Sequence, residues 1–195
     1  MSMPAHVPTP RPASRRWTLA EVQALNDGAP EGAPDYELIA GELLVTPSPV
    51  GPHQRVVREL VLALGNWLRE HRVGDVFDSP FDVELEPESL VRPDVFVVPP
   101  EEAVRLETEM PARILTLVIE VLSPSTARAD RGPKRELYQR HVPEYWIVDL
   151  DAELVERWRP GEKRPEILSE WLEWHPSRSE GTLTIGLPGL FRRRM

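Results

Sequence analysis

Two acidic residues in apolar surroundings are the first candidates for chemistry in this sequence. Glu120 interrupts residues 115–122, a mostly β-branched apolar run that is typical of a strand covered on both faces. Asp94 stands directly before a second apolar run, residues 95–98. Burying a carboxylate without a partner is costly, so each acid needs a cation beside it, either a basic side chain or a metal ion.

Lys134 is the cation that would complete such a site. It lies on a helix predicted over residues 130–141, after a turn at residues 123–126 that ends the strand of Glu120. Two carboxylates on neighbouring strands can hold one or two Mg²⁺ ions, with water and phosphate oxygens as the other ligands. The lysine could orient or help deprotonate the attacking water and stabilise charge developing on phosphorus. The alternative is a buried structural ion pair of Glu120 with Lys134 or Arg128.

Four further residues are weaker candidates for the same site. Glu37 and Glu42 could supply an additional acid from an early hairpin, although exposed hairpin glutamates are common. His53 could line the site or contact phosphate, but an ordinary hydrogen bond at a helix terminus is the more common role. Tyr138 follows Lys134 by four residues and therefore shares its helix face, where packing is more common than catalysis.

The elements that must position these residues follow from the spacing of apolar side chains. Helices are predicted over residues 18–25, 51–72 and 130–141. Strands are predicted over residues 36–39, 42–45, 76–77, 81–85, 95–98, 115–122, 145–148, 154–158, 167–168 and 182–185. Asp130 is expected to be the N-cap of the last helix, because Pro133 is tolerated only in a first turn.

Composition bounds the class of protein. The chain has 195 residues, 41% of them hydrophobic, and no cysteine, which excludes disulfides and thiolate metal sites. We expect one domain over residues 17–195 and a disordered, proline-rich tail over residues 1–16. No apolar run is long enough for a membrane span and no signal-peptide core is present, so we expect a cytoplasmic protein.

The charge is unevenly distributed. A formal net charge of −9 argues against a general nucleic-acid binder, since such proteins usually carry a basic excess. Residues 82–109 carry nine acids against two arginines, a net charge of −7, whereas residues 126–140 carry five basic residues against two acids, a net charge of +3. A locally basic face near Glu120 is therefore compatible with an acidic molecule.

Five sequence motifs together resemble those of the bacterial putative restriction endonuclease family, within the PD-(D/E)XK nuclease superfamily. They are YELIAGEL at residues 36–43, RPDV at 92–95, IEVLSPST at 119–126, Asp130-Arg131 with Lys134 and Tyr138, and VPEYWIVD at 142–149. The resemblance covers residues 17–191, about the whole predicted domain.

The resemblance implies an α/β (α+β) fold, in which a mixed central β-sheet flanked by helices forms a restriction-endonuclease-like core. It makes Asp94 the motif aspartate and Glu120 the motif acid. Leu122 occupies the position that is lysine in the superfamily, and in this family the following helix supplies the lysine, here Lys134. The implied activity is that of a Mg²⁺-dependent or Mn²⁺-dependent endonuclease acting on nucleic acid, with DNA as the expected substrate.

Two alternatives and two structural expectations complete the prediction. The chain could be a non-catalytic nucleic-acid-binding or protein-interaction module that retains the fold, or a glycosidase that uses Asp94 and Glu120 as paired acids without a metal. If both carboxylates bind one ion, they should lie about 3–6 Å apart at one sheet edge. Cutting two antiparallel strands with one site per subunit favours a homodimer, with the tryptophan-rich C-terminal part as the candidate surface.

Overall fold

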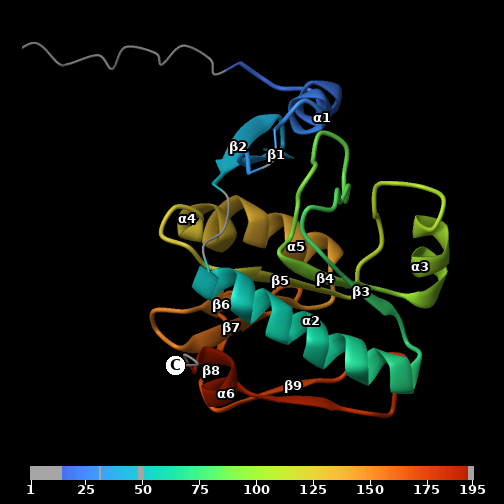
Figure 1. Cartoon of the computed structure of the whole chain (residues 1–195), viewed down its shortest axis with the longest axis vertical. Coiled ribbons are helices and arrows are strands. Elements are labelled where there is room, and N and C mark those ends of the chain that lie inside the picture. The colour runs from blue at the N-terminus through green and yellow to red at the C-terminus, as the bar shows by residue number, and fades with distance from the viewer. Residues whose placement is uncertain (1–14, 31, 48–50, 193–195) are drawn as a thin grey trace, which may run out of the picture.

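A six-stranded sheet forms the centre of the protein, in the order β3-β4-β5-β6-β7-β8 (Figure 1). The structure is a computed structural model that describes residues 15–30, 32–47 and 51–192. The strands are β3 (Asp75–Asp78), β4 (Val95–Val98), β5 (Leu117–Val121), β6 (Tyr145–Asp149), β7 (Leu154–Trp158) and β8 (Glu166–Leu168). Of the neighbouring pairs, β5 and β6 run parallel and the rest antiparallel. The expected mixed sheet is confirmed.

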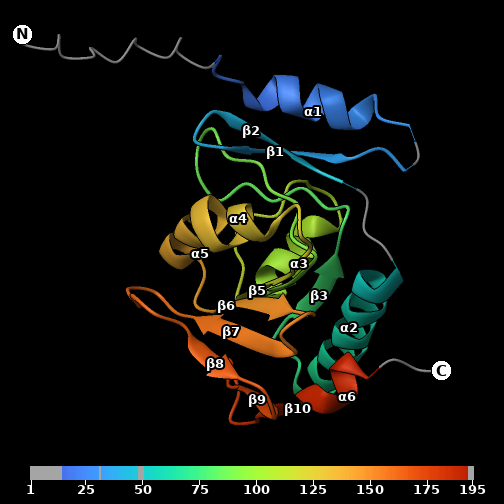
Figure 2. The ribbon, with the colours of Figure 1, turned by 90° about the vertical axis from the view of Figure 1, so that its left-hand side faces the viewer.

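Helices cover both faces of this sheet, as Figure 2 shows. On one face, α2 (Gly51–His71) buries an apolar stripe that includes Leu60 and Leu64 against Ile119. On the other, α5 (Arg135–His141) packs Leu137 against Val118. Because successive strand residues point to opposite faces, β5 must be apolar on both sides, which explains its continuous apolar run.

A hairpin and a short helix form a separate layer beside the main sheet. They are α1 (Leu19–Asp27), β1 (Asp35–Ile39) and β2 (Glu42–Thr46). The turn places Ala40 at φ 51° and Gly41 at φ 80°, both in the left-handed region that two-residue hairpin turns require. Backbone hydrogen bonds in both directions between Leu38 and Leu90, at 2.7 and 2.8 Å, attach β1 to the loop that precedes β4.

The C-terminal part of the chain packs against α2. It comprises β9 (Trp171–Trp174), β10 (Leu183–Gly186) and α6 (Leu187–Phe191), while α3 (Pro100–Leu106) follows β4. Trp174 is buried in the core shared with α2, whereas Trp171 remains 63% exposed.

Residues 1–14 of the predicted tail lie outside the described residues, but Arg16 is described and forms an ion pair with Glu88. No described helix has the length and apolarity of a transmembrane segment.

The helix predicted over residues 130–141 begins earlier, and Asp130 is not its N-cap. The chain forms α4 (Ala127–Ala129), a π-helical turn η1 (Asp130–Lys134) and then α5. Pro133 has no N–H, and Gly132 adopts non-helical angles of φ −112° and ψ −108°, so the helix widens instead of starting at this point. The wide turn buries Asp130 and Lys134 together.

The strand predicted over residues 81–85 is also wrong. Val83 makes isolated bridges to Val91 and Ala112, and its neighbours extend neither into a ladder. Val83 is nevertheless fully buried. The alternation of apolar and acidic residues correctly indicated that a side chain is buried here. A loop that crosses the core can bury one side chain with isolated bridges alone, without forming a strand.

Gly74 is required where the chain passes from α2 to β3. A Cβ at Gly74 would lie 2.2 Å from the carbonyl oxygen of Val98, which is fixed in the sheet. We expect Gly74→Ala to lower the free energy of unfolding by about 1–3 kcal/mol, the usual cost of overpacking. Urea denaturation measures the change.

Gly65→Ala is the matched control, since Gly65 lies inside α2 and its Cβ would sit 3.4 Å from Val76 Cγ1. Alanine is favoured over glycine in a helix by about 0.5–1 kcal/mol, so this variant should be at least as stable as the natural chain. Equal unfolding midpoints for the two variants would contradict the requirement for glycine at position 74.

Candidate active site

A cleft of about 1120 Å³ opens where β5 ends, between the β1–β2 hairpin, the start of α2 and η1. Its charged lining consists of Asp35, Glu37, Arg55, Arg92, Asp94, Glu120, Asp130, Arg131, Lys134, Asp149, Asp151 and Glu153. His53 also lines the cleft, and Tyr138 is buried beneath it. Glu42 is exposed and does not line it. Thus the main candidates gather at one end of the sheet, and one of the auxiliary acids does not.

Asp94 and Glu120 lie at the same end of the sheet. The antiparallel register pairs Val95 of β4 with Ile119 of β5, so Asp94, which directly precedes β4, comes beside the part of β5 that carries Glu120. Asp94 Oδ2 accepts a hydrogen bond from the backbone N–H of Val121 at 2.7 Å, which anchors Asp94 to the strand of Glu120.

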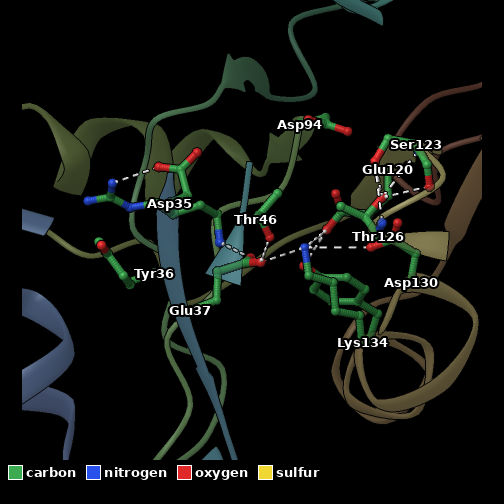
Figure 3. A network of polar contacts seen from close by, with 12 residues as sticks. Asp35, Tyr36, Glu37, Thr46, Asp94, Glu120, Ser123, Thr126, Asp130 and Lys134 are labelled. Atoms are coloured by element: carbon green, nitrogen blue, oxygen red, sulfur yellow. Dashed lines mark hydrogen bonds and ion pairs between the residues drawn. The ribbon is translucent and has the colours of Figure 1, made fainter. Parts of the chain in front are cut away.

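Lys134 Nζ lies among three carboxylates, which Figure 3 shows converging on it. The ammonium is 2.9 Å from Glu37 Oε2, 3.0 Å from Glu120 Oε1 and 3.7 Å from Asp130 Oδ1. Its residue is only 2% exposed. Tyr138 donates a second hydrogen bond to the same Glu120 oxygen at 3.0 Å. The face shared by Lys134 and Tyr138 therefore points at the acid of β5, as their spacing predicts.

Asp94 and Glu120 each have one carboxylate oxygen that receives no hydrogen bond from the described residues. Both donors to the Glu120 side chain reach Oε1, and both partners of the Asp94 side chain, His53 Nε2 at 3.1 Å and Val121 N, reach Oδ2. No other described residue donates to Glu120 Oε2 or Asp94 Oδ1. Two unpaired carboxylate oxygens in a cleft are a donor set suited to a hard divalent cation.

Glu37 has no such free oxygen. Its Oε1 accepts a hydrogen bond from the backbone N–H of Arg92 at 2.8 Å, and its Oε2 accepts one from Thr46 at 3.1 Å in addition to the contact with Lys134. Glu37 is 1% exposed. It therefore holds the ammonium of Lys134 in place from the hairpin and offers nothing further to a metal ion.

Burial and crowding of charge shift the acid–base properties of this cluster. Burial raises the pKa of Glu120 well above its usual range, and repulsion from Asp130, Asp94 and Glu37 adds to the rise, while Lys134 partly offsets it. Burial lowers the pKa of Lys134, but the surrounding carboxylates outweigh it, so that pKa is raised well above its usual range. Lys134 is thus held as a cation, and a further positive charge would favour the ionised form of Glu120.

Asp130 belongs to the buried cluster around Lys134 and is not the helix N-cap that the sequence predicts. It is 1% exposed, and its Oδ1 has no hydrogen-bond partner among the residues that the structure describes. Burial raises its pKa to about 6, although the positive charge of Lys134 opposes the rise. The signal for this role was present in the sequence, because Asp130 precedes Lys134 by four residues and a helix brings such residues to one face.

His53 is tied to Asp94 from the first turn of α2. Burial lowers the pKa of this imidazole, but the hydrogen bond and charge of Asp94 outweigh the burial, and the net direction is upward. His53 is 7% exposed, and its contact with Asp94 suits it to hold that carboxylate in position.

Comparisons with known proteins agree with this geometry. The family described as "Uma2: Putative restriction endonuclease" matches residues 19–190. The chain belongs to this family. The Uma2 match runs from α1 into α6 and includes every residue that lines the cleft except Phe191, the last residue of α6.

A solved structure shares the fold. It is described as a putative nuclease belonging to DUF820 from Anabaena variabilis ATCC 29413, and it matches with a TM-score of 0.73 and 23% sequence identity over 90% of this chain and 97% of that one. A search of curated proteins finds no match. The expected family resemblance and the mixed α/β fold of this Uma2 protein are confirmed.

Asp130 should make stability depend on pH. Its pKa is 3.8 in an unfolded chain and about 6 in the fold, so the folded state holds the proton more tightly. The stabilisation is fully present below pH 3.8 and is lost as the pH rises through about 6, a loss on the order of 3 kcal/mol at about 1.4 kcal/mol per unit. Asp130→Asn has no proton to lose, so its stability relative to the natural chain should rise between pH 4 and pH 7.

Chemical denaturation at both pH values, without divalent ions, tests this expectation. Asp151→Asn is the control, because Asp151 lines the same cleft but is exposed, and its variant should differ from the natural chain equally at both pH values. A difference for Asp130→Asn that does not change with pH would contradict the burial of an ionisable Asp130.

Proposed function

We propose that this Uma2 protein is a Mg²⁺-dependent endonuclease that hydrolyses phosphodiester bonds in DNA. The observation that carries the proposal is that Asp94 and Glu120 lie at one end of the sheet beside the buried ammonium of Lys134, each with one carboxylate oxygen that no described residue hydrogen-bonds. Membership in a family described as "Putative restriction endonuclease" supports nucleic acid as the substrate class.

Asp94 and Glu120 would hold the metal. Mg²⁺, or Mn²⁺ in its place, takes oxygen ligands and commonly uses only one or two protein carboxylates, with waters and phosphate oxygens completing its shell. Among the described residues, no three or more histidines, aspartates or glutamates cluster as a closed metal cage. Two free carboxylate oxygens fit the open kind of site. A bound divalent ion would supply Lewis-acid activation of the phosphoryl group and of the attacking water.

Lys134 would act as a charged hydrogen-bond donor. Three carboxylates keep its pKa raised, so it retains its proton and serves poorly as a general base. Its position next to Glu120 suits it to orient the attacking water or to stabilise the charge that develops on the phosphoryl oxygens. Glu37 and Asp130 would position the ammonium, Tyr138 would position Glu120, and His53 would position Asp94.

A non-catalytic module that retains the fold is the second candidate. Three carboxylates surround Lys134. This favours the non-catalytic module, because a fully satisfied buried ion cluster can persist for structural reasons alone. The glycosidase alternative would use Asp94 and Glu120 without a metal, so dependence on a divalent ion separates it from the nuclease.

Replacing Lys134 tests the catalytic proposal directly. Lys134→Met keeps most of the stem and removes the charge, and removing one electrostatic donor of this kind slows the chemical step about 10²–10³-fold. Metal binding, measured by calorimetry, should be largely retained. Cleavage of supercoiled and single-stranded DNA with Mg²⁺, Mn²⁺ or chelator provides the rate.

Lys163→Met is the matched control, since Lys163 is the other lysine of the chain and is exposed in the turn between β7 and β8. Its activity should equal that of the natural chain, while Glu120→Gln should lose activity together with metal affinity. Equal metal-dependent cleavage by all variants would reveal a contaminating nuclease. No cleavage by the natural chain with either metal would favour the non-catalytic module.

We also propose that the protein works as a homodimer, so that two sites can cut two antiparallel strands. The exposed side chains of Ile167 and Trp171, 55% and 63% exposed, lie at the C-terminal side and are candidates for the contact. Light scattering at micromolar concentration should give the mass of two chains, and Trp171→Glu should shift it toward one. A one-chain mass for the natural protein would overturn the dimer.

A further inference from the structure

The cleft is strongly acidic, and most of its cations are already neutralised. Eight carboxylates line it against four lysine and arginine side chains, a formal net charge of −4. Arg92, Arg131 and Lys134 each contact at least two carboxylates within 4.0 Å. A polyanionic substrate would therefore meet repulsion at most of this surface, apart from any bound divalent ion.

Arg55 differs from the other cations of the cleft. Within the described part of the chain, no carboxylate lies within ion-pair distance of its guanidinium. Its hydrogen bonds go instead to two backbone carbonyls at the end of α6, from Nη1 to Leu190 at 2.8 Å and from Nη2 to Phe191 at 3.4 Å. Carbonyl oxygens hold the group in place without neutralising its charge.

The guanidinium also has N–H donors that no described residue engages. Arginine has five N–H donors in a planar fork, and the two carbonyls of α6 engage two of them. The remaining donors belong to a side chain that lines the cleft and is only partly buried. Such a fork matches the geometry of two phosphate oxygens.

Arg55 lines the same cleft as the candidate metal ligands Asp94 and Glu120. It follows His53 by two residues on α2, so the two side chains leave different sides of the helix, and His53 Nε2 is 3.1 Å from Asp94 Oδ2. The first residues of α2, Gly51 to His53, and Phe191 of α6 line the same cleft. The positive end of the helix dipole adds to the charge of Arg55 at this point, which makes it the favourable side for an anion.

We propose that Arg55 binds a backbone phosphate of the nucleic acid, on the nucleotide that flanks the scissile bond. The inference rests on the proposed function and adds the residue that positions the substrate. Because Arg55 would contact a phosphate that does not react, it contributes equally to binding of the ground state and the transition state. Its loss should raise KM and leave kcat unchanged.

The salt dependence of binding provides the test. Each phosphate contact contributes about 0.9 to the slope of log K against log[salt], so losing one contact should make the affinity drop between 50 and 200 mM salt about 3-fold smaller. Binding of a fluorescent DNA duplex is measured by anisotropy in the otherwise natural chain, with Ca²⁺ in place of Mg²⁺ to keep the duplex intact. Arg55→Gln should show the smaller slope, and Arg55→Lys should restore it because the slope counts charge.

Arg58→Gln is the matched control. Arg58 is exposed on the same helix, lies 3.7 Å from Glu59 and does not line the cleft, so its variant should keep the natural slope. Partial unfolding of Arg55→Gln would lower the active fraction without changing the slope. A natural slope in Arg55→Gln, or an equal change in Arg58→Gln, would overturn the Arg55 contact while nucleic-acid binding stands. Absence of any binding by the natural chain would overturn the proposed function as well.

Discussion

The buried ammonium of Lys134 is the interaction on which the arrangement of the other elements depends. It joins Glu37 of the hairpin, Glu120 of the central strand and Asp130 of the π turn, three segments that otherwise belong to different layers. Removing one partner of a buried ion pair typically costs about 3–5 kcal/mol, because an uncompensated charge remains. The hairpin is not paired with the main sheet, and this ion cluster, the bonds between Leu38 and Leu90 and the contacts of Arg92 with the hairpin acids all help to fix its position.

The same cluster leaves the site short of positive charge. Three carboxylates surround one ammonium, and Asp94 lies at the same end of the sheet with one oxygen that no described residue hydrogen-bonds. Burial raises the pKa of Glu120 and of Asp130, and repulsion among the crowded carboxylates adds to both rises. A divalent cation would relieve the repulsion that burial imposes, so binding of the ion and ionisation of the acids would favour each other.

Local patterns predicted those features that depend on near neighbours in the chain. The apolar run around Glu120, the stripe of α2 and the turn at Gly41 each carry their own signal, and the motif order indicated the fold. The four-residue spacing of Asp130 and Lys134 carried a signal for their contact, but the helix starts three residues before Asp130, so Asp130 is not its cap. The role of Glu37 depends on a lysine 97 positions away, a partner chosen by tertiary packing that spacing along one segment does not report.

The π turn makes the site sensitive to chain length as well as to residue identity. An α-helix advances about 100° per residue, so deleting Gly132 would rotate Asp130 and Lys134 relative to each other by about that angle. Every acid, the lysine and the tyrosine would still be present in such a sequence, yet the ammonium would no longer lie among the carboxylates. Within this family, a relative can therefore keep all the motif residues and lack the site, and the number of residues between them is the feature to compare.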